Sequence, residues 1–428
     1  MCDRGLKLLA ENVTPSFTQG IASSVSQNVT GNTSALEGCH IVRFKDMKFL
    51  PWDNPDNIIS AEVEDIARRV KDNLLPVIFL IGGPANIINM VVYYRQGLKE
   101  RINLCLFALS LADELYLLYS MFLFGEQIYL QFITEERYGP IMRFMVNNNL
   151  VCFFGFYWVS QVLSAIIASE RCLCVLSPLR FQTLLQTRTM VVIITVVYLV
   201  VVGVYFLVAT RYRVECIFDP PSNTARYIAI AGEFFRNHEK LINYLDSFVY
   251  GAAIPGVMIS VVTTTTTITA MKIREAAAWR MGASSANGPS SSSTLSSISS
   301  QELALTKMLI GISLLFIVCV SQFALLRFAW FFMPEMDVGC RHHNLYLTGL
   351  WIAEPFSLVN SSFNILVYYS MGSRYRETFW SLFRITTQDK AEEKHNEDSR
   401  YLTHTHTHTH THTHTHTHTH THTHKIIH

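Results

Sequence analysis

The chain contains seven long apolar runs separated by polar segments. The first run, LLPVIFLIGGPANIINMVVYY, has no charged residue between Leu74 and Tyr94, and the fourth, MVVIITVVYLVVVGVYFLVA, is equally uncharged. A helix needs about 20 apolar residues to cross a bilayer, whereas buried helices of soluble proteins are usually shorter and amphipathic. The pattern therefore predicts seven membrane-spanning helices, over residues 74–94, 104–124, 148–169, 190–209, 247–271, 308–332 and 346–369.

The composition supports a membrane protein and excludes several other classes. Half of the 428 residues are hydrophobic and 16% are charged, against about 25% charged in an average soluble domain. A formal net charge of +1 excludes a strongly basic nucleic-acid binder. The sequence holds neither a Gly-rich phosphate loop nor a Cys/His set with metal-ligand spacing, so we do not expect an enzyme.

Glycosylation motifs and basic residues indicate the orientation. Three N-glycosylation acceptors, Asn12, Asn28 and Asn32, lie in a polar N-terminal segment without an apolar signal sequence, so the first span would insert the chain. Lys and Arg are more frequent in the segments that would then face the cytoplasm, in line with the positive-inside rule. We expect a multi-pass plasma-membrane protein with an extracellular glycosylated tail over 1–72, a seven-helix domain over 73–384 and a disordered cytoplasmic tail over 385–428.

Two segments have low sequence complexity. Residues 283–300 are Ser-rich, which is typical of a flexible loop, here between spans five and six. Residues 403–424 are repeated Thr-His pairs, which offer metal ligands but no fixed geometry. We therefore favour a disordered tail without a fixed role over a metal site.

Charged residues inside the predicted spans are the first candidates for function, because a charge in the bilayer is costly. Asp113 lies in span two, and Glu354 lies in span seven. Glu170 and Arg171 lie at the inner end of span three. Each of these charges needs a partner or a function.

These charges belong to an ordered set of motifs that resembles the rhodopsin-like G-protein-coupled receptors over residues 74–384. The set consists of Asn86 in span one, Asn103, Leu109 and Asp113 in span two, Glu170-Arg171-Cys172 in span three, Pro255 in span five, Phe316-x-x-Cys319 in span six and Asn364-x-x-x-Tyr368 in span seven. Each motif is short, but each stands in the expected span. The resemblance implies an all-α membrane protein, a seven-transmembrane helix bundle. A short amphipathic helix would follow the seventh span, formed by Tyr375, Arg376, Phe379, Leu382 and Phe383.

The chain also departs from the family pattern. Span four has no Trp, span six lacks its usual Trp and Pro, and Ile365 replaces the Pro of span seven. Thr263, Gln161 and Val146 stand where members usually carry a Tyr, an aliphatic residue and a Cys. In these departures the chain resembles divergent invertebrate orphan or chemosensory receptors, such as those of molluscs.

The resemblance implies a receptor that binds an extracellular ligand and signals through a heterotrimeric G-protein by a population shift between two helix arrangements. Arg171 is expected to exchange carboxylate partners, with Glu170 near it and Glu302 farther away. Asn364 and Tyr368 would belong to the same switch. Glu302 can instead cap a helix in Ser299-Ser300-Gln301-Glu302. If Glu302 is a lock, Glu302→Ala would raise ligand-free signalling.

A second group surrounds Asp113. The resemblance places Ser160, Asn360, Ser361 and Asn364 around this carboxylate. Such an oxygen-rich set suits Na⁺ as an allosteric ion, and we expect no other cofactor. The alternative is a hydrated polar network that holds the helices together.

The ligand site is expected at the outer ends of the spans. Phe153 stands where amine receptors carry an Asp, so a biogenic amine is not expected, and the body of span seven has no Lys for a retinal Schiff base. The candidate ligand-binding residues are Phe153, Tyr157, Glu126, Arg327, Trp330 and Glu354. Arg327 and Glu354 can instead pair with each other. A peptide and a small water-borne molecule both remain as ligand classes.

Two other functions are possible for a chain with seven spans. A seven-span ligand-gated channel or a transporter is the alternative function, although we find no internal repeats of the transporter type.

Cys216 lies in the loop of the family's usual bridge, but its partner position is Val146. Because the seventh span packs beside the first in this architecture, we expect Cys39 to pair with Cys340 and Cys216 to be free or variably paired. The alternative is that no bond forms.

Overall fold

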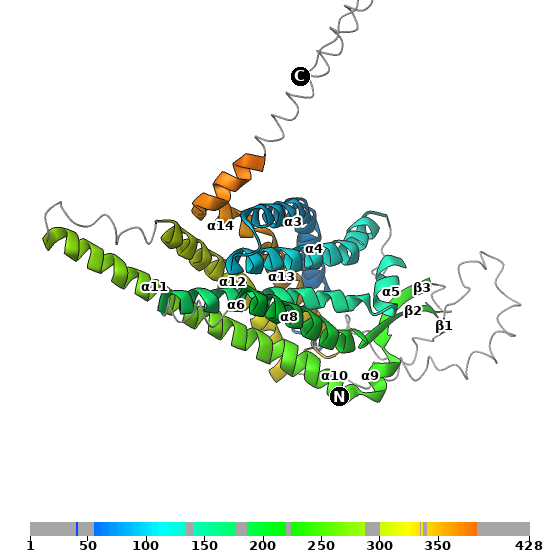
Figure 1. Cartoon of the computed structure of the whole chain (residues 1–428). Helices are drawn as coiled ribbons and strands as arrows, with labels where there is room; N and C mark the ends of the chain where they lie inside the picture. The colour runs from blue at the N-terminus through cyan, green and yellow to red at the C-terminus, as the bar shows by residue number, and fades with distance from the viewer. Residues whose placement is uncertain are drawn as a thin grey trace, which may run out of the picture. The chain divides into compact units, whose positions relative to one another are not determined.

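The computed structural model describes residues 40–41, 55–133, 140–176, 186–219, 224–286, 300–333, 335–336 and 340–382. The chain divides into two units, Met1–Arg374 and Tyr375–His428. The first unit is a bundle of long helices (Figure 1).

Six helical segments are long and apolar enough to cross a membrane by length and composition, counted over the described part of the chain. They contain the first six predicted runs, except that the third segment begins at Leu150, two residues after the predicted run. Their helices are α3 (Ala61–Gln96), α4 (Arg101–Ile133), η5 (Leu150–Phe154) with α6 (Gly155–Leu176), α8 (Thr187–Ala209), the π-helical η6 (Tyr244–Ala253) with α11 (Ile254–Ala286), and α12 (Ser300–Phe332).

The seventh predicted run forms two consecutive helices. These are α13 (His343–Ser362) and α14 (Asn364–Met371), and they are separated by Phe363. The interruption falls next to Ile365, the position at which the family's Pro is missing. Together the helices are consistent with the predicted seven-helix bundle.

We call the end of the bundle at which α3 begins the near end, and the end at which α6 finishes the far end. The near end carries the short helices α5 (Pro140–Asn147), α9 (Glu233–Asn237) and α10 (Glu239–Asn243). It also carries a small sheet in which β2 (Tyr212–Asp219) pairs antiparallel with β3 (Thr224–Ala231) and parallel with β1 (His40–Ile41). The all-α prediction missed this sheet, because its residues lie in a loop outside the apolar runs.

Helix packing brings the first and seventh spans together. The helix α3 packs against α4 and α13, α6 against α4, α8 and α11, and α12 against α11 and α13. Gly82 marks a close approach, because a Cβ atom there would lie 2.2 Å from the Ser362 Oγ of α13. Glycine is needed at this position for the two helices to meet.

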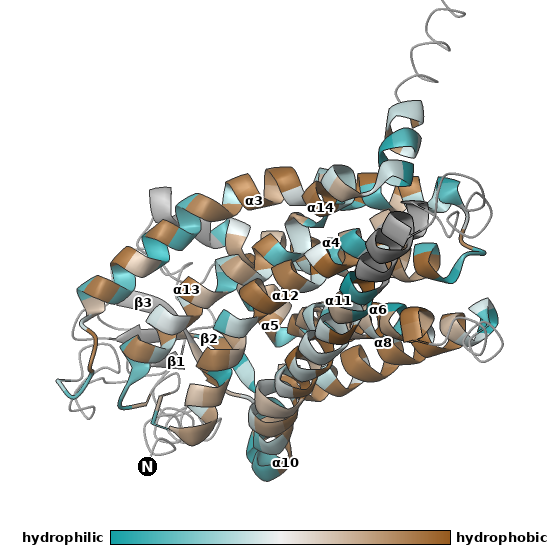
Figure 2. Cartoon of the chain, turned by 90° about the vertical axis from the view of Figure 1, so that its left-hand side faces the viewer, coloured by the Kyte–Doolittle hydropathy of each residue, from teal (hydrophilic) through white to brown (hydrophobic). Residues whose placement is uncertain are grey.

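The outward faces of the spans are apolar, as a lipid environment requires. Leu80 of α3 is 77% exposed and Leu199 of α8 is 70% exposed. In α8 only 11% of the apolar window is buried, and its ribbon is hydrophobic over most of its length (Figure 2). A helix with this surface would be unstable in water, so α8 is a membrane helix on the rim of the bundle.

Residues 373–382 are also helical. In the second unit, Tyr375 stacks on Phe379, and Phe379 makes an edge contact with Trp380. A helix after the seventh span is therefore confirmed over the described residues, which end before Phe383.

Candidate functional site

An aromatic cluster fills the near half of the bundle. Phe154 of η5 lies 5.3 Å from the ring of Tyr157, 5.6 Å from Tyr205 and 6.2 Å from Phe323. Tyr157 is fully enclosed and also contacts Tyr116. These rings come from α4, α6, α8 and α12, so they bring the predicted residue Tyr157 to the centre of the bundle.

Phe153 does not belong to this cluster. Its side chain is 40% exposed and stacks on Phe156 at the periphery. Phe153 stands where amine receptors carry an Asp, but residues 150–154 form a 3₁₀ helix. Because a 3₁₀ turn holds fewer residues, the inward position falls on Phe154.

Arg327 pairs with Asp246 and not with Glu354. The Asp246 carboxylate of η6 accepts a hydrogen bond from Arg327 at 2.5 Å and one from Arg211 at 2.9 Å. Trp330 covers the Arg327 guanidinium at 4.4 Å. The alternative in which Arg327 and Glu354 pair with each other is therefore wrong, because a nearer carboxylate at the start of span five takes its place.

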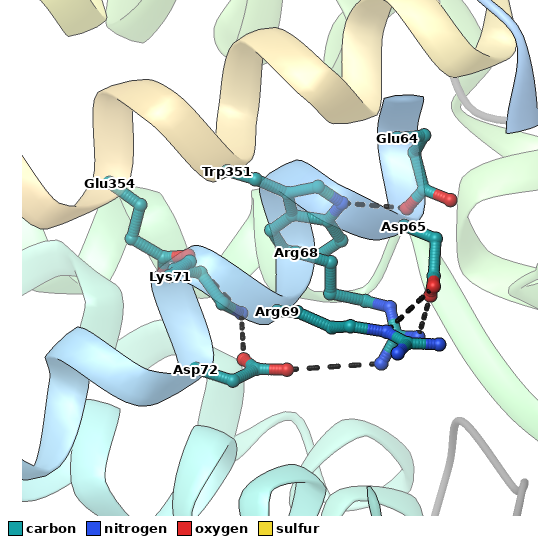
Figure 3. Close-up of polar contacts among 8 residues, drawn as sticks. All are labelled: Glu64, Asp65, Arg68, Arg69, Lys71, Asp72, Trp351 and Glu354. Carbon is teal, nitrogen blue, oxygen red and sulfur yellow. Dashed lines mark hydrogen bonds and ion pairs between the residues drawn. The ribbon is translucent and has the colours of Figure 1, made fainter. Parts of the chain in front are cut away.

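Glu354 lies instead in a buried group of charges between α3 and α13 (Figure 3). Its carboxylate lies 3.9 Å from the ammonium group of Lys71, which also lies 3.1 Å from Asp72. Lys71 and Asp72 are almost completely buried. We call Lys71, Asp72, Glu354 and the rings of Phe124 and Trp351 the Lys71 cluster.

Glu126 has a structural role at the near end. Its two carboxylate oxygens accept hydrogen bonds from the backbone N–H groups of Ile141 and Met142, at 2.7 and 2.6 Å. These are donors in the first turn of α5, which have no partner within their own helix. The carboxylate therefore caps α5, and its predicted ligand contact stays a prediction.

Asp113 is the centre of a compact polar network in the middle of the bundle. Ser160 donates to one carboxylate oxygen at 2.7 Å, and Asn364 donates to the other at 3.0 Å. Ser361 is fully buried, and its backbone carbonyl accepts a hydrogen bond from Asn86 at 2.7 Å. Asn360 is buried on the same helix, without a direct hydrogen bond to Asp113 among the described contacts. The predicted grouping is thus largely present, and it joins α3, α4, α6 and the junction between α13 and α14.

Arg171 is held by its sequence neighbour at the far end. The Arg171 Nε lies 2.5 Å from a carboxylate oxygen of Glu170, which is buried. An apolar pocket between α6, α8 and α11 reaches Glu170 and is lined by Ala165, Ile166, Met190, Ile193 and Met258. Tyr368, the other switch residue in α14, packs edge-on against Tyr93 of α3 at 5.3 Å.

Several predicted residues lie outside the part of the chain that the structure describes. These are the three glycosylation acceptors, Cys39 and the side chain of Glu302. Cys216 and Cys340 are both disulfide-bonded, so Cys216 is not free. The pairing of Cys39 with Cys340 stays a prediction.

The sequence analysis missed Lys71, Asp72, Arg211 and Asp246. Each lies just outside a predicted apolar run, where a charge is ordinarily assigned to the membrane surface. Lys71, Asp72 and Asp246 lie in helices that begin before the runs, and Arg211 lies in the turn after α8. All four residues are buried. The sequence does carry a signal for these pairs. Lys71 and Asp246 stand just before spans one and five, and residues of opposite charge, Glu354 and Arg327, stand inside spans seven and six.

The helix order and the apolar surfaces indicate a multi-pass membrane protein and are consistent with a seven-helix receptor of the G-protein-coupled class. Comparison with protein families gives the same class. Residues 73–386 match the family described as serpentine type 7TM GPCR chemoreceptor Srw, and the chain belongs to this family. Among curated proteins, no relative matches the chain.

Proposed function

We propose that this receptor is a chemoreceptor of the plasma membrane, with its near end outside the cell and its far end in the cytoplasm. The glycosylation motifs before the first span and the distribution of Lys and Arg support this orientation. The ligand is an extracellular peptide or a small water-borne molecule, bound among the aromatic and charged residues of the near end. Its binding favours the active helix arrangement, which a heterotrimeric G-protein recognises.

The single observation that carries this proposal is the Glu170–Arg171 pair at the far end of α6. A guanidinium group is permanently charged and can exchange one carboxylate or carbonyl partner for another. Arg171 is released from Glu170 in the active arrangement and becomes available to the G-protein. Glu302 of α12 is the second partner that we propose for Arg171 in the inactive arrangement.

The Asp113 network is a candidate Na⁺ site. Asp113, Ser160 and Ser361 offer one carboxylate and two hydroxyl groups, which are the hard oxygen ligands that such a cation prefers. A bound Na⁺ would compete with the donors of Ser160 and Asn364 for the same carboxylate. It would stabilise one of the two helix arrangements and so change the affinity for agonists.

The test is a ligand screen in cells that express the receptor with a promiscuous G-protein reporter. We expect at least one peptide or small molecule to evoke a signal, and Arg171→Ala to abolish it at equal surface expression. Arg188→Ala is the matched control, since Arg188 is exposed at the start of α8, and it should respond normally.

Two results would contradict the proposal. One is a ligand response that survives in Arg171→Ala. The other is a ligand-evoked current that persists after the G-proteins are inactivated, which would favour the channel alternative.

A further inference from the structure

The ammonium group of Lys71 is enclosed at the near end of the bundle. It is completely buried, and it lies between the carboxylates of Asp72, at 3.1 Å, and Glu354, at 3.9 Å (Figure 3). Asp72 precedes the apolar run of α3 on the same helix, whereas Glu354 belongs to α13. Two carboxylates therefore face one ammonium group, and Arg68 approaches Asp72 from the rim at 3.8 Å.

Two aromatic rings complete the enclosure. The Lys71 Nζ lies 4.1 Å from the ring centre of Trp351 and 4.5 Å from that of Phe124. The indole N–H of Trp351 donates to Glu64 at 2.7 Å, which fixes the orientation of the ring. Aromatic faces combined with carboxylates are the usual surroundings of a bound ammonium group.

Lys71 fits this enclosure incompletely. Its Nζ, both oxygens of Asp72 and one oxygen of Glu354 lack hydrogen-bond partners, although all are buried. A buried charge without good hydrogen bonds is costly. An ammonium group that could place its three N–H donors freely would satisfy these oxygens better than one attached to α3.

We propose that Asp72, Phe124, Trp351 and Glu354 form an ammonium-binding subsite, which Lys71 fills in the ligand-free receptor and a primary alkylammonium group of the ligand fills in the bound receptor. Lys71 has a flexible four-carbon stem that can withdraw toward the near end. The inference rests on the proposed receptor function, and it deepens that function by naming the ligand's chemical class. Amine receptors carry an Asp in span three, where this chain has Phe153. In this receptor the carboxylates that would bind an ammonium group lie instead on spans one and seven.

The test uses the full-length receptor in lipid nanodiscs and n-butylammonium as the probe. Lys71→Ala vacates the subsite, and the thermal unfolding midpoint is measured against probe concentration. We expect a saturable rise for Lys71→Ala. In the wild type the half-maximal concentration should be more than about tenfold higher, because Lys71 leaves the subsite vacant for only a fraction of the time.

Two controls make the result specific. n-Butanol has the same chain without the charge and should not raise the midpoint. Lys71→Ala/Glu354→Gln should lose most of the response to n-butylammonium. An equal response to both probes, or an unchanged response in the double variant, would overturn the subsite.

The design also covers a poorly folding variant and a failure of the proposed function. If Lys71→Ala accumulates poorly, its folded yield with n-butylammonium in the medium is measured, and absence of rescue counts against the subsite. The midpoint needs no G-protein. Stabilisation by n-butylammonium without any G-protein signal would therefore refute the proposed function but support the subsite. A G-protein signal without stabilisation by n-butylammonium would refute the subsite alone.

Discussion

The buried ion pairs at the two ends of the bundle differ in what they connect. At the near end, Asp246 of η6 bonds to Arg327 of α12, and Lys71 of α3 lies against Glu354 of α13. At the far end, the buried carboxylate of Glu170 bonds to its neighbour Arg171. These two near-end pairs join different helices, although Lys71 also lies against Asp72 of its own helix, while the far-end pair lies within α6.

This difference bears on which part of the receptor can move. Breaking a near-end pair removes a link between two helices. Arg171 can leave Glu170 without removing such a link, although the Glu170 carboxylate is itself buried. The other ion pairs described at the far end are exposed, such as Arg374 with Glu100, and exposed pairs contribute little to stability. The comparison indicates a fixed near end and a far end that opens at low cost.

The largest effect on stability is expected from Asp246→Asn. The substitution removes the carboxylate that both Arg327 and Arg211 contact, and loss of one partner from a buried ion pair typically costs about 3–5 kcal/mol. The measurement is the thermal unfolding midpoint of the receptor in nanodiscs. Asp56→Asn is the matched control, because the pair of Asp56 with Arg341 is exposed. Equal midpoints for the two variants would show that the near end is not held by this pair.

A smaller effect is expected from Asp113→Asn in the middle of the bundle. Ser160 and Asn364 donate to different oxygens of Asp113, and the substitution replaces one of these oxygens with an NH₂ donor. One of the two hydrogen bonds is therefore lost, and the loss of a buried hydrogen bond to a charged group costs about 1–3 kcal/mol. The variant should signal weakly and lose any Na⁺ dependence of agonist affinity. Glu114→Gln alters the neighbouring residue and should keep both properties. Full signalling and an intact Na⁺ effect in Asp113→Asn would contradict the assignment.

The sequence predicted the helices better than the contacts. Runs of about 20 apolar residues fixed the spans, and short motifs placed Asp113 near Ser160 and Asn364. Phe153 lies outside the aromatic cluster, in the 3₁₀ segment of residues 150–154, and its ligand contact stays a prediction. Partner choice at the near end was also beyond the sequence. The sequence offered Arg327 more than one carboxylate, and Asp246, in the π-helical start of span five, is the one that it bonds.

The central claim, that the Glu170–Arg171 pair switches signalling with little effect on stability, is tested most directly by Glu170→Gln. Ligand-free G-protein activation and the unfolding midpoint are measured together, with Glu275→Gln as control because Glu275 forms an exposed far-end pair with Lys272. We predict that Glu170→Gln raises ligand-free activation and lowers the midpoint much less than Asp246→Asn does. Unchanged activation, or a midpoint loss as large as that of Asp246→Asn, would contradict the account.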